Sequence, residues 1–176
     1  MSDDASTLFD FRCCQAILNL RSASLPRVSK GKDTMPYWRS HHHVVWSTTR
    51  RRRVLTGERV DIVAAVIRSK ARDLGCLVHA VAVQPDHVHI ALSIPPKQAP
   101  ARVIGQLKGA SSRLLRLRDP QLIEDAFFWQ AEYGIISFSG RDFDEIIGYI
   151  RDQDQRHAEA RLNDQLERDM EESLNR

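Results

Sequence analysis

Two histidines, His87 and His89, stand one residue apart inside a run rich in valine, isoleucine and alanine. Such a run is typical of a β-strand. Because alternate side chains of a strand face the same side, both imidazoles project together, with Cα atoms roughly 6.5 Å apart, while Val88 points the other way into a core. Either the pair lies on a solvated face, or it binds a divalent metal ion, for which neutral imidazole is a common ligand. The metal-binding interpretation requires a third ligand from elsewhere in the chain.

Strand and helix patterns alternate around this run. The order predicted is strand, helix, strand, strand, helix, strand, helix, with the second and third strands joined by a turn at Pro85-Asp86. This order predicts an α+β fold of the ferredoxin-like split βαβ type, an antiparallel sheet with helices on one face. The expected strands are 43–49, 77–84, 87–94 and a region at 127–138, and the expected helices are 56–74, 99–118 and 143–157.

The chain of 176 residues is long enough for one domain with a sizeable core and some extension. Serine, glycine, lysine and aspartate dominate residues 22–33, so we expect residues 1–35 to be a weakly ordered N-terminal extension. The predicted domain spans residues 36–157. Residues 158–176 are highly charged, with an apolar residue at every fourth position, and are interpreted as a helical tail.

Composition excludes several classes of protein. No stretch approaches the roughly 18 consecutive apolar residues of a membrane span, and the N-terminus lacks a signal-peptide pattern, so the expected compartment is the cytoplasm. The three cysteines include one adjacent pair and form no Cys-x-x-Cys, which argues against a disulfide framework and against a zinc ribbon. No glycine-rich phosphate loop is present, so no nucleotide cofactor is expected.

Charge is unevenly distributed along the chain. The net charge is +3, but residues 36–157 contain 18 basic and 13 acidic residues, whereas residues 158–176 contain three basic and six acidic ones. A basic domain suits a polyanionic partner such as nucleic acid, although a solvated charge run is the commoner explanation for any single patch. The candidate phosphate contacts are Arg50, Arg51, Arg52, Arg53, Lys108, Arg113 and Arg116.

The last predicted helix carries a candidate nucleophile and a candidate third ligand. Tyr149 and Gln153 are four residues apart, so a regular helix would place them on one face. A tyrosine hydroxyl is a possible covalent nucleophile, and an amide oxygen can bind a metal ion. A buried helix tyrosine with its hydroxyl at the rim is the alternative reading of Tyr149.

Together these motifs resemble a known family. His87-Val88-His89 resembles the HUH motif, and with Tyr149-x-x-x-Gln153 it resembles the single-tyrosine transposases of small bacterial insertion sequences and the REP-associated tyrosine transposases. Further similar segments are His42–Thr48, which resembles the family's first strand, and Trp129–Gly134, before the catalytic helix. The resemblance covers roughly Pro36 to His157.

The resemblance implies a function and its site residues. It implies metal-dependent cleavage and rejoining of single-stranded DNA through a 5′-phosphotyrosine, with Tyr149 on a C-terminal catalytic helix as the nucleophile. His87, His89 and Gln153 would bind Mg²⁺ or Mn²⁺; two nitrogens and one amide oxygen suit Mn²⁺, whereas Mg²⁺ favours oxygen ligands. The implied partners are DNA hairpins and a second copy of the chain in a homodimer, acting at the bacterial nucleoid.

Two other functions fit the same fold. A DNA-binding module without transposition activity would use the basic residues alone, although a decayed enzyme should have lost at least one of His87, His89, Tyr149 or Gln153, and all four are present. A rolling-circle replication nickase would share the metal motif, but such chains usually carry a further helicase or primase region. Trp46, Trp129 and Tyr133 could stack on unpaired bases, although aromatic residues of strands more often lie in the core.

Overall fold

The computed structural model describes residues 38–124 and 127–167 of the chain. Within these ranges, four antiparallel strands form one sheet in the order β2-β3-β1-β4. The order is that of the ferredoxin-like fold, with one long helix between β1 and β2 and another between β3 and β4, and the predicted α+β class is confirmed. The strands are β1 (His41–Ser47), β2 (Leu77–Val83), β3 (His87–Ser93) and β4 (Gly134–Phe138).

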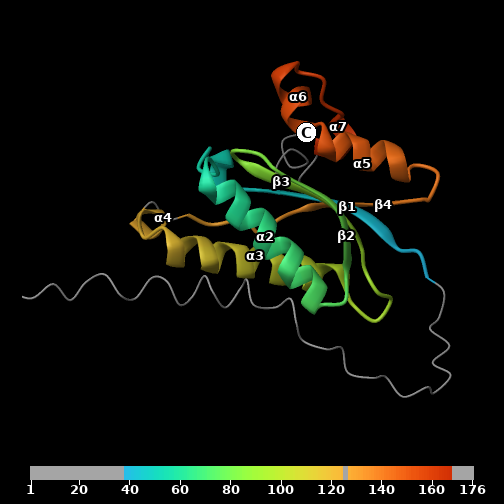
Figure 1. Ribbon diagram of the computed structural model, residues 1–176, viewed down its shortest axis with the longest axis horizontal. Helices are drawn as coiled ribbons and strands as arrows, with labels where there is room; N and C mark the ends of the chain where they lie inside the picture. The colour runs from blue at the N-terminus through green and yellow to red at the C-terminus, as the bar shows by residue number, and fades with distance from the viewer. Residues whose placement is uncertain (1–37, 125–126, 168–176) are drawn as a thin grey trace, which may run out of the picture. The chain divides into compact units, whose positions relative to one another are not determined.

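The helices lie on both sides of this sheet. Figure 1 shows α2 (Glu58–Asp73) and α3 (Pro100–Arg118) side by side along one face, and α5 (Phe143–Arg151) over the opposite face together with α6 (Gln153–Ala158) and α7 (Asp164–Glu167). Two short elements, η1 (Thr49–Arg51) and α4 (Gln121–Glu124), follow β1 and α3. No helix in the described ranges is both long and apolar enough to cross a membrane.

Residue type alternates along the central strands, and this alternation gives the sheet two different faces. On β3, Val88, Ile90 and Leu92 are fully buried in the larger apolar cluster. His87 and His89 occupy the alternate positions of the same strand and point to the other face. The register pairs His89 with Val45 and Val88 with Trp46, so β1 alternates in the same phase.

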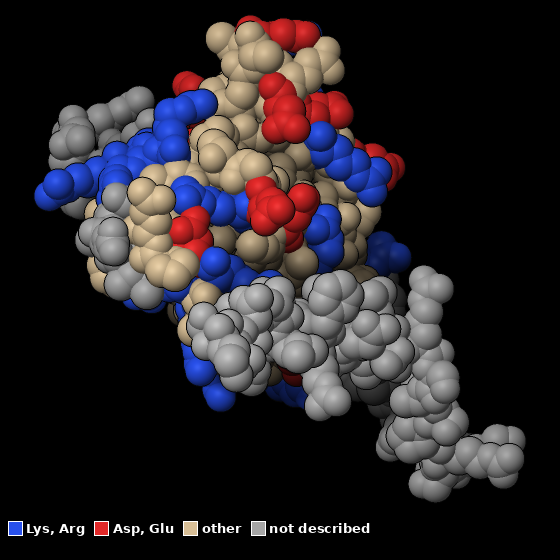
Figure 2. Space-filling model, turned by 60° about the vertical axis from the view of Figure 1, so that its left-hand side comes forward, with Lys and Arg blue, Asp and Glu red and all other residues tan. Residues whose placement is uncertain are grey.

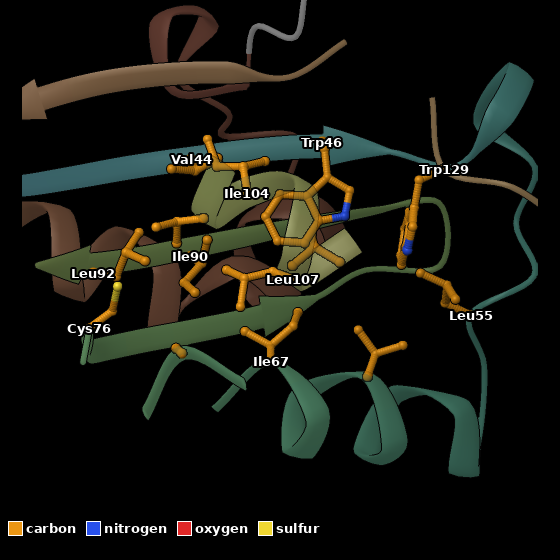
Figure 3. Packing of buried hydrophobic residues seen from close by; sticks show 14 of the residues in the cluster. Val44, Trp46, Leu55, Ile67, Cys76, Ile90, Leu92, Ile104, Leu107 and Trp129 are labelled. Atoms are coloured by element: carbon orange, nitrogen blue, oxygen red, sulfur yellow. The ribbon is translucent and has the colours of Figure 1, made fainter. Parts of the chain in front are cut away.

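The larger core lies between the sheet and the pair α2 and α3. Figure 3 shows Trp46 from β1 reaching toward this layer, with Leu107 and Ile67 contributed by the two helices. Trp129, which precedes β4, packs its ring edge-on against Trp46, with ring centroids 6.0 Å apart. Trp46 and Trp129 are therefore core residues, as strand aromatics usually are.

The ends of these helices follow from local sequence. Gly75 adopts a left-handed φ of +71° after α2, its N–H donates to Arg72, and the N–H of Cys76 donates to the carbonyl of Ala71. These two hydrogen bonds form a Schellman motif, which satisfies carbonyls that the helix leaves without partners. Pro100 occupies the first turn of α3, where its missing N–H costs no hydrogen bond.

Two elements differ from the sequence prediction. The fourth strand was expected over 127–138, but only Gly134–Phe138 pairs with β1, and Trp129 makes an isolated bridge with Thr48. Lys108 accounts for part of the difference, because its ammonium group donates to the carbonyls of residues 130, 131 and 132, which then have a partner other than β1. The helix expected over 143–157 is interrupted at Asp152, which separates α5 from α6.

The predicted ends of the chain are described only in part. The expected extension at residues 1–35 lies outside the described residues, as does the end of the tail from residue 168. Residues 159–167 are described and include α7, whose Leu166 packs against a second, smaller apolar cluster. That cluster lies between the sheet and α5 and contains Ala80, Ala91, Ile146, Ile147, Tyr149 and Ile150.

Candidate metal and nucleophile site

The two motif histidines project from β3 into a buried space on the α5 side of the sheet. His87 is 2% exposed and His89 is fully buried, and their rings lie 4.9 Å apart. The neighbouring positions on this face are small, since Ala91 follows on β3 and Ala82 pairs with His89 from β2. Small side chains leave room for the overlying helix to approach, and the reading of the pair as two residues on a solvated face is wrong.

Asp86 fixes the orientation of His87. Its carboxylate oxygen Oδ1 lies 2.7 Å from Nδ1 of His87 and accepts the hydrogen of that nitrogen. Burial raises the pKa of Asp86, but the hydrogen bond from His87 and the positive charges of Arg51 and Arg53 outweigh it, so the pKa is lowered overall. A carboxylate on Nδ1 leaves Nε2 free of its proton, the tautomer that a metal ion requires.

His43 of β1 supports His89 in a similar way. The two rings stack with centroids 5.2 Å apart, and Nε2 of His43 forms a hydrogen bond of 3.0 Å with Nδ1 of His89. Burial, together with the nearby His89, lowers the pKa of His43 to about 3, and burial also lowers the pKa of His89. Both rings are therefore neutral at pH 7, as metal binding by His89 requires.

Tyr149 reaches the same space from α5. Its side chain is 4% exposed, and its hydroxyl donates a hydrogen bond to Oε1 of Glu167 and accepts one of 3.0 Å from the N–H of Asn163. Burial is the main cause that raises the pKa of Tyr149 to about 12, and the charge of Glu167 adds to it. The hydroxyl is therefore protonated at neutral pH, and Arg156 lies over the phenol ring at 4.7 Å.

Gln153 begins α6, one residue after the interruption that ends α5. The interruption means that Tyr149 and Gln153 do not lie on one regular helix, yet both meet the same carboxylate, since Nε2 of Gln153 donates to Oε1 of Glu167 at 3.3 Å. The amide is 1% exposed, and its Oε1 is buried without a hydrogen-bond partner among the described residues. Nitrogen and oxygen of an amide exchange places by a rotation, so this oxygen can turn toward the histidines.

Glu167 lies at the centre of the arrangement. Its Oε2 is 3.2 Å from Nε2 of His89 and 3.6 Å from Nε2 of His87. Burial raises the pKa of Glu167, but the hydrogen bond of His89, the positive charge that His89 carries when it is protonated, and the hydrogen bond of Tyr149 lower it to about 2. The carboxylate is therefore ionised and brings a negative charge into a space lined by imidazoles.

A fourth group, His157 of α6, completes a cluster of candidate ligands. One ligand atom from each of His87, His89, His157 and Glu167 lies within 4.8 Å of all the others. Among the described residues, Nε2 of His87 and Nε2 of His157 are buried without a hydrogen-bond partner. Together with the amide oxygen of Gln153, these atoms would be satisfied by one cation, so the donor set fits a divalent metal ion.

The basic segment Arg50–Arg53 is fastened to the turn that precedes His87. The N–H of Thr48 donates to the carbonyl of Asp86 at 2.8 Å, and the N–H of Leu55 donates to that of Pro85 at 2.9 Å. Arg51 lies 3.9 Å from the carboxylate of Asp86. Arg50 and Arg51 have left-handed φ angles of 57° and 48°, an unusual conformation for residues other than glycine that is common in functional loops.

Arg50 and Arg52 of this segment border a hollow of about 290 Å³ between η1 and the stretch before β4. Phe128 lines it with half of its side chain exposed, and the guanidinium group of Arg116 lies over the Phe128 ring at 5.1 Å. The lining residues are Thr48, Thr49, Arg50, Arg52, Val54, Phe127 and Phe128.

The candidate phosphate contacts on α3 differ in what surrounds them. Lys108 is held by three backbone carbonyls and lies 5.9 Å from the ring centre of Tyr133, so its ammonium group already has an intramolecular role. Arg113 is exposed, and Arg116 donates to the carbonyl of Ser112 beside Phe128. Figure 2 shows Lys and Arg side chains spread across one face of the molecule, with acidic side chains both near the top and in the middle of the view.

Sequence reasoning missed four residues of the site. His157 follows Gln153 by four positions, and this helical spacing could have identified it. Asp86 is the residue next to His87, and His43 lies in the segment that resembles the family's first strand. Glu167 carried no signal, because it is one of six acidic residues in the tail and lies 78 positions from His89.

Comparison with known proteins places these residues in a family context. The family model described as "Transposase IS200 like" matches residues 36–153. The chain is 36% identical over 115 residues to the ISDra2 transposase TnpA of Deinococcus radiodurans, covering 64% of this chain and 82% of that protein. It is 28% identical over 119 residues to the transposase for insertion sequence element IS200 of Salmonella typhimurium, covering 66% and 78%.

Two solved structures have a similar fold. A crystal structure of a candidate transposase from Deinococcus radiodurans R1 superposes with a TM-score of 0.56 and 28% identity, covering 72% of this chain and 98% of that one. The REP-associated tyrosine transposase bound to a REP hairpin superposes with a TM-score of 0.53 and 17% identity, covering 70% and 74%. The second likeness shows the fold alone.

Proposed function

Because the chain belongs to the family of IS200-like transposases, we propose that it cleaves and rejoins single-stranded DNA through a covalent bond to Tyr149. The observation that carries the proposal is the meeting of this hydroxyl with the two motif histidines. The hydroxyl of Tyr149 and Nε2 of His89 contact the two oxygens of the same carboxylate, that of Glu167. Metal-assisted phosphoryl transfer needs a nucleophile positioned close to the metal ion that binds the phosphate. The shared carboxylate brings the Tyr149 hydroxyl close to the candidate metal ligands in this way.

In this proposal, His87, His89 and Gln153 hold a divalent cation, Mg²⁺ or Mn²⁺. Asp86 keeps His87 in the binding tautomer, and His43 keeps His89 in place. When bound, the cation polarises the scissile phosphate and neutralises the charge that gathers on it. Two imidazoles favour Mn²⁺ on ligand preference, and the carboxylate and amide oxygens suit either ion.

The reaction conserves the energy of the phosphodiester. The oxygen of Tyr149 forms a bond to phosphorus, and the bond from phosphorus to the 3′-oxygen breaks, so one strand keeps a 5′-phosphotyrosine and the other a 3′-hydroxyl. The phenol proton leaves to solvent, and the departing 3′-oxygen takes one up. Attack by the 3′-hydroxyl of another strand reverses the step and rejoins DNA, so no nucleotide cofactor is needed.

The DNA strand would approach along the basic loop. Arg50–Arg53 connect directly to the turn that carries Asp86, so phosphates bound by this loop lie beside the strand that bears His87. The hollow that contains Phe128 and Arg116 offers an aromatic ring and a guanidinium plane, on which an unpaired base can stack. We propose that this chain also binds a DNA hairpin, as the REP-associated tyrosine transposase does in its structure.

The test uses single-stranded oligonucleotides that carry the hairpins flanking the gene of this chain. Protein and oligonucleotide are incubated with Mn²⁺ or Mg²⁺ and separated on a denaturing gel. We expect a metal-dependent covalent adduct that the Tyr149→Phe variant does not form, while hairpin binding in a native gel is nearly unchanged. Tyr133→Phe is the matched control, since Tyr133 lies beside Lys108 on the other side of the sheet, and it should form the adduct normally.

Hairpin binding without an adduct under both metals would contradict the proposal. That outcome would favour a DNA-binding module that keeps the fold without the chemistry. Loss of hairpin binding in Tyr149→Phe would instead show that the hydroxyl has a structural role in this part of the molecule.

A further inference from the structure

The carboxylate of Glu167 comes from a segment beyond the part of the chain that the family model matches. The match ends at residue 153, and Glu167 is the last residue of α7. Nevertheless α7 is fastened to the domain at two places. The N–H of Asn163 donates to the hydroxyl of Tyr149 at 3.0 Å, and Leu166 packs against the apolar cluster under α5. One of these contacts lies just before α7 and the other within it, and together they hold Glu167 in the site.

The distances around this carboxylate are those expected when two imidazoles and a carboxylate share one cation, although Oε2 of Glu167 also forms a hydrogen bond with Nε2 of His89. Ligands about 2.1 Å from an octahedral cation lie about 3 Å from their neighbours. Oε2 of Glu167 lies 3.2 Å from Nε2 of His89 and 3.6 Å from Nε2 of His87. The second distance is too long for a hydrogen bond, so this nitrogen is close to the carboxylate without being satisfied by it.

The charge and chemistry of the donor set point the same way. His87, His89 and Gln153 are neutral when they act as ligands, and a hard divalent cation is bound better when an anionic oxygen is present. Glu167 supplies the only carboxylate in the cluster of candidate ligands formed by the described residues. Its other oxygen, Oε1, accepts the hydrogen bond of Tyr149, so one side chain contacts both the ligand pair and the nucleophile.

We propose that Glu167 is a ligand of the catalytic cation and that it holds the hydroxyl of Tyr149 beside that cation. This inference rests on the proposed function and makes α7, outside the family match, a part of the metal centre. The carboxylate binds the cation through Oε2 and positions the phenol through Oε1. Folding of α7 onto the sheet and loading of the metal then stabilise each other.

The test measures Mn²⁺ binding to the full chain without DNA, by electron paramagnetic resonance of the free ion. We expect Glu167→Gln to weaken Mn²⁺ binding at least tenfold, because the variant keeps the size of the side chain and removes its charge. Asp164→Asn is the matched control, since Asp164 begins the same helix, is exposed and loses the same charge, and its Mn²⁺ affinity should equal that of the unaltered chain.

A second variant separates a ligand from a merely structural residue. Glu167→Asp keeps the carboxylate on a shorter side chain, so it should recover part of the affinity that Glu167→Gln loses. Circular dichroism of each variant establishes that the fold is retained. Equal loss of affinity in Glu167→Asp and Glu167→Gln, or normal Mn²⁺ affinity in Glu167→Gln, would overturn the inference.

The outcome distinguishes this inference from the proposed function. If His87→Ala abolishes Mn²⁺ binding while Glu167→Gln preserves it, the inference fails and the proposed metal site stands. If Glu167→Gln preserves Mn²⁺ binding and also forms more of the covalent DNA adduct, Glu167 competes with the scissile phosphate and is no ligand, which overturns the inference too. If the unaltered chain binds no Mn²⁺, both fail.

Discussion

The two faces of the β-sheet are made by the same strands, yet they are built on opposite principles. The face under α2 and α3 carries Val44, Trp46, Val88, Ile90 and Leu92, and nearly every side chain there is apolar. The face under α5 carries His43, His87 and His89, and these polar side chains lie beside the smaller apolar cluster. Alternation along β1 and β3 therefore separates the residues that stabilise the fold from those assigned to chemistry.

The difference is also one of energy. On the apolar face, burial itself is favourable and each side chain contributes roughly 1.5–3 kcal/mol. On the polar face, buried nitrogens and oxygens are stabilised only when they have partners, and several lack one among the described residues. The apolar face is stabilised mainly by burial, whereas the polar face should gain stability from a cation.

The largest effect is expected on the apolar face. Leu107 of α3 is fully buried in the larger core, so Leu107→Ala removes apolar contacts and leaves a cavity. We expect the free energy of unfolding to fall by about 2–5 kcal/mol, measured by urea denaturation. The Mn²⁺ affinity of the folded variant should be unchanged, because Leu107 lies on the other side of the sheet.

Leu117 provides the control for this variant. It lies on the same helix but is 69% exposed, so Leu117→Ala should change the free energy of unfolding by less than about 0.5 kcal/mol. A comparable loss in both variants, or a weaker Mn²⁺ affinity in Leu107→Ala, would show that the two faces are not independent.

The same contrast explains what the sequence could predict. The apolar periodicity of residues 56–74 and 99–118 located α2 and α3 closely, and the alternation around His87 and His89 located β3 and its two faces. These signals are local, since a helix or strand needs one apolar side wherever it packs. The hairpin at Pro85-Asp86 is equally local, and the order of elements then determined the fold class.

The remaining differences depend on contacts between distant segments. The stretch before β4 has strand composition, but Lys108 holds its carbonyls and Trp129 enters the core. The periodicity of 143–157 continues through Asp152 without showing that the helix is interrupted there. Glu167 reaches His89 across 78 positions, and no local pattern marks one glutamate among several in an acidic tail.

Metal binding offers a second comparison of the two faces. Mn²⁺ at about 100 times its dissociation constant should stabilise the folded chain by about 2.7 kcal/mol, provided that the unfolded chain does not bind it. A rise in the midpoint of thermal unfolding measures this effect. His87→Ala should abolish the rise, because it removes a ligand from the polar face.

Leu107→Ala has a lower free energy of unfolding without metal, but Mn²⁺ should raise this free energy by the same amount as in the unaltered chain. Sites that share no partners contribute additively. If Mn²⁺ still stabilises His87→Ala, the ion binds elsewhere on the chain. If Mn²⁺ no longer stabilises Leu107→Ala, the polar face is ordered only through the apolar core.

The smallest effect is expected in the pH dependence of the metal-free chain. His43 has a folded pKa of about 3 and an ordinary unfolded value near 6.5, because burial disfavours its charged form. Between these two pH values the unfolded chain binds a proton at His43 and the folded chain does not, so acidification favours unfolding. From pH 7 to pH 5, His43 should contribute a loss of about 2 kcal/mol.

Urea denaturation in the presence of a chelator, at pH 7 and at pH 5, measures this loss. His43→Gln keeps a hydrogen-bonding side chain beside His89 and cannot take up the proton, so its stability should fall less steeply on acidification. His42→Gln, at the adjacent and less buried position, is the control and should reduce the slope by less, although burial lowers the pKa of His42 as well. If the free energy of unfolding falls equally from pH 7 to pH 5 in His43→Gln and in the unaltered chain, the polar face admits a charged imidazole. The two faces would then differ less in their tolerance of charge than their composition indicates.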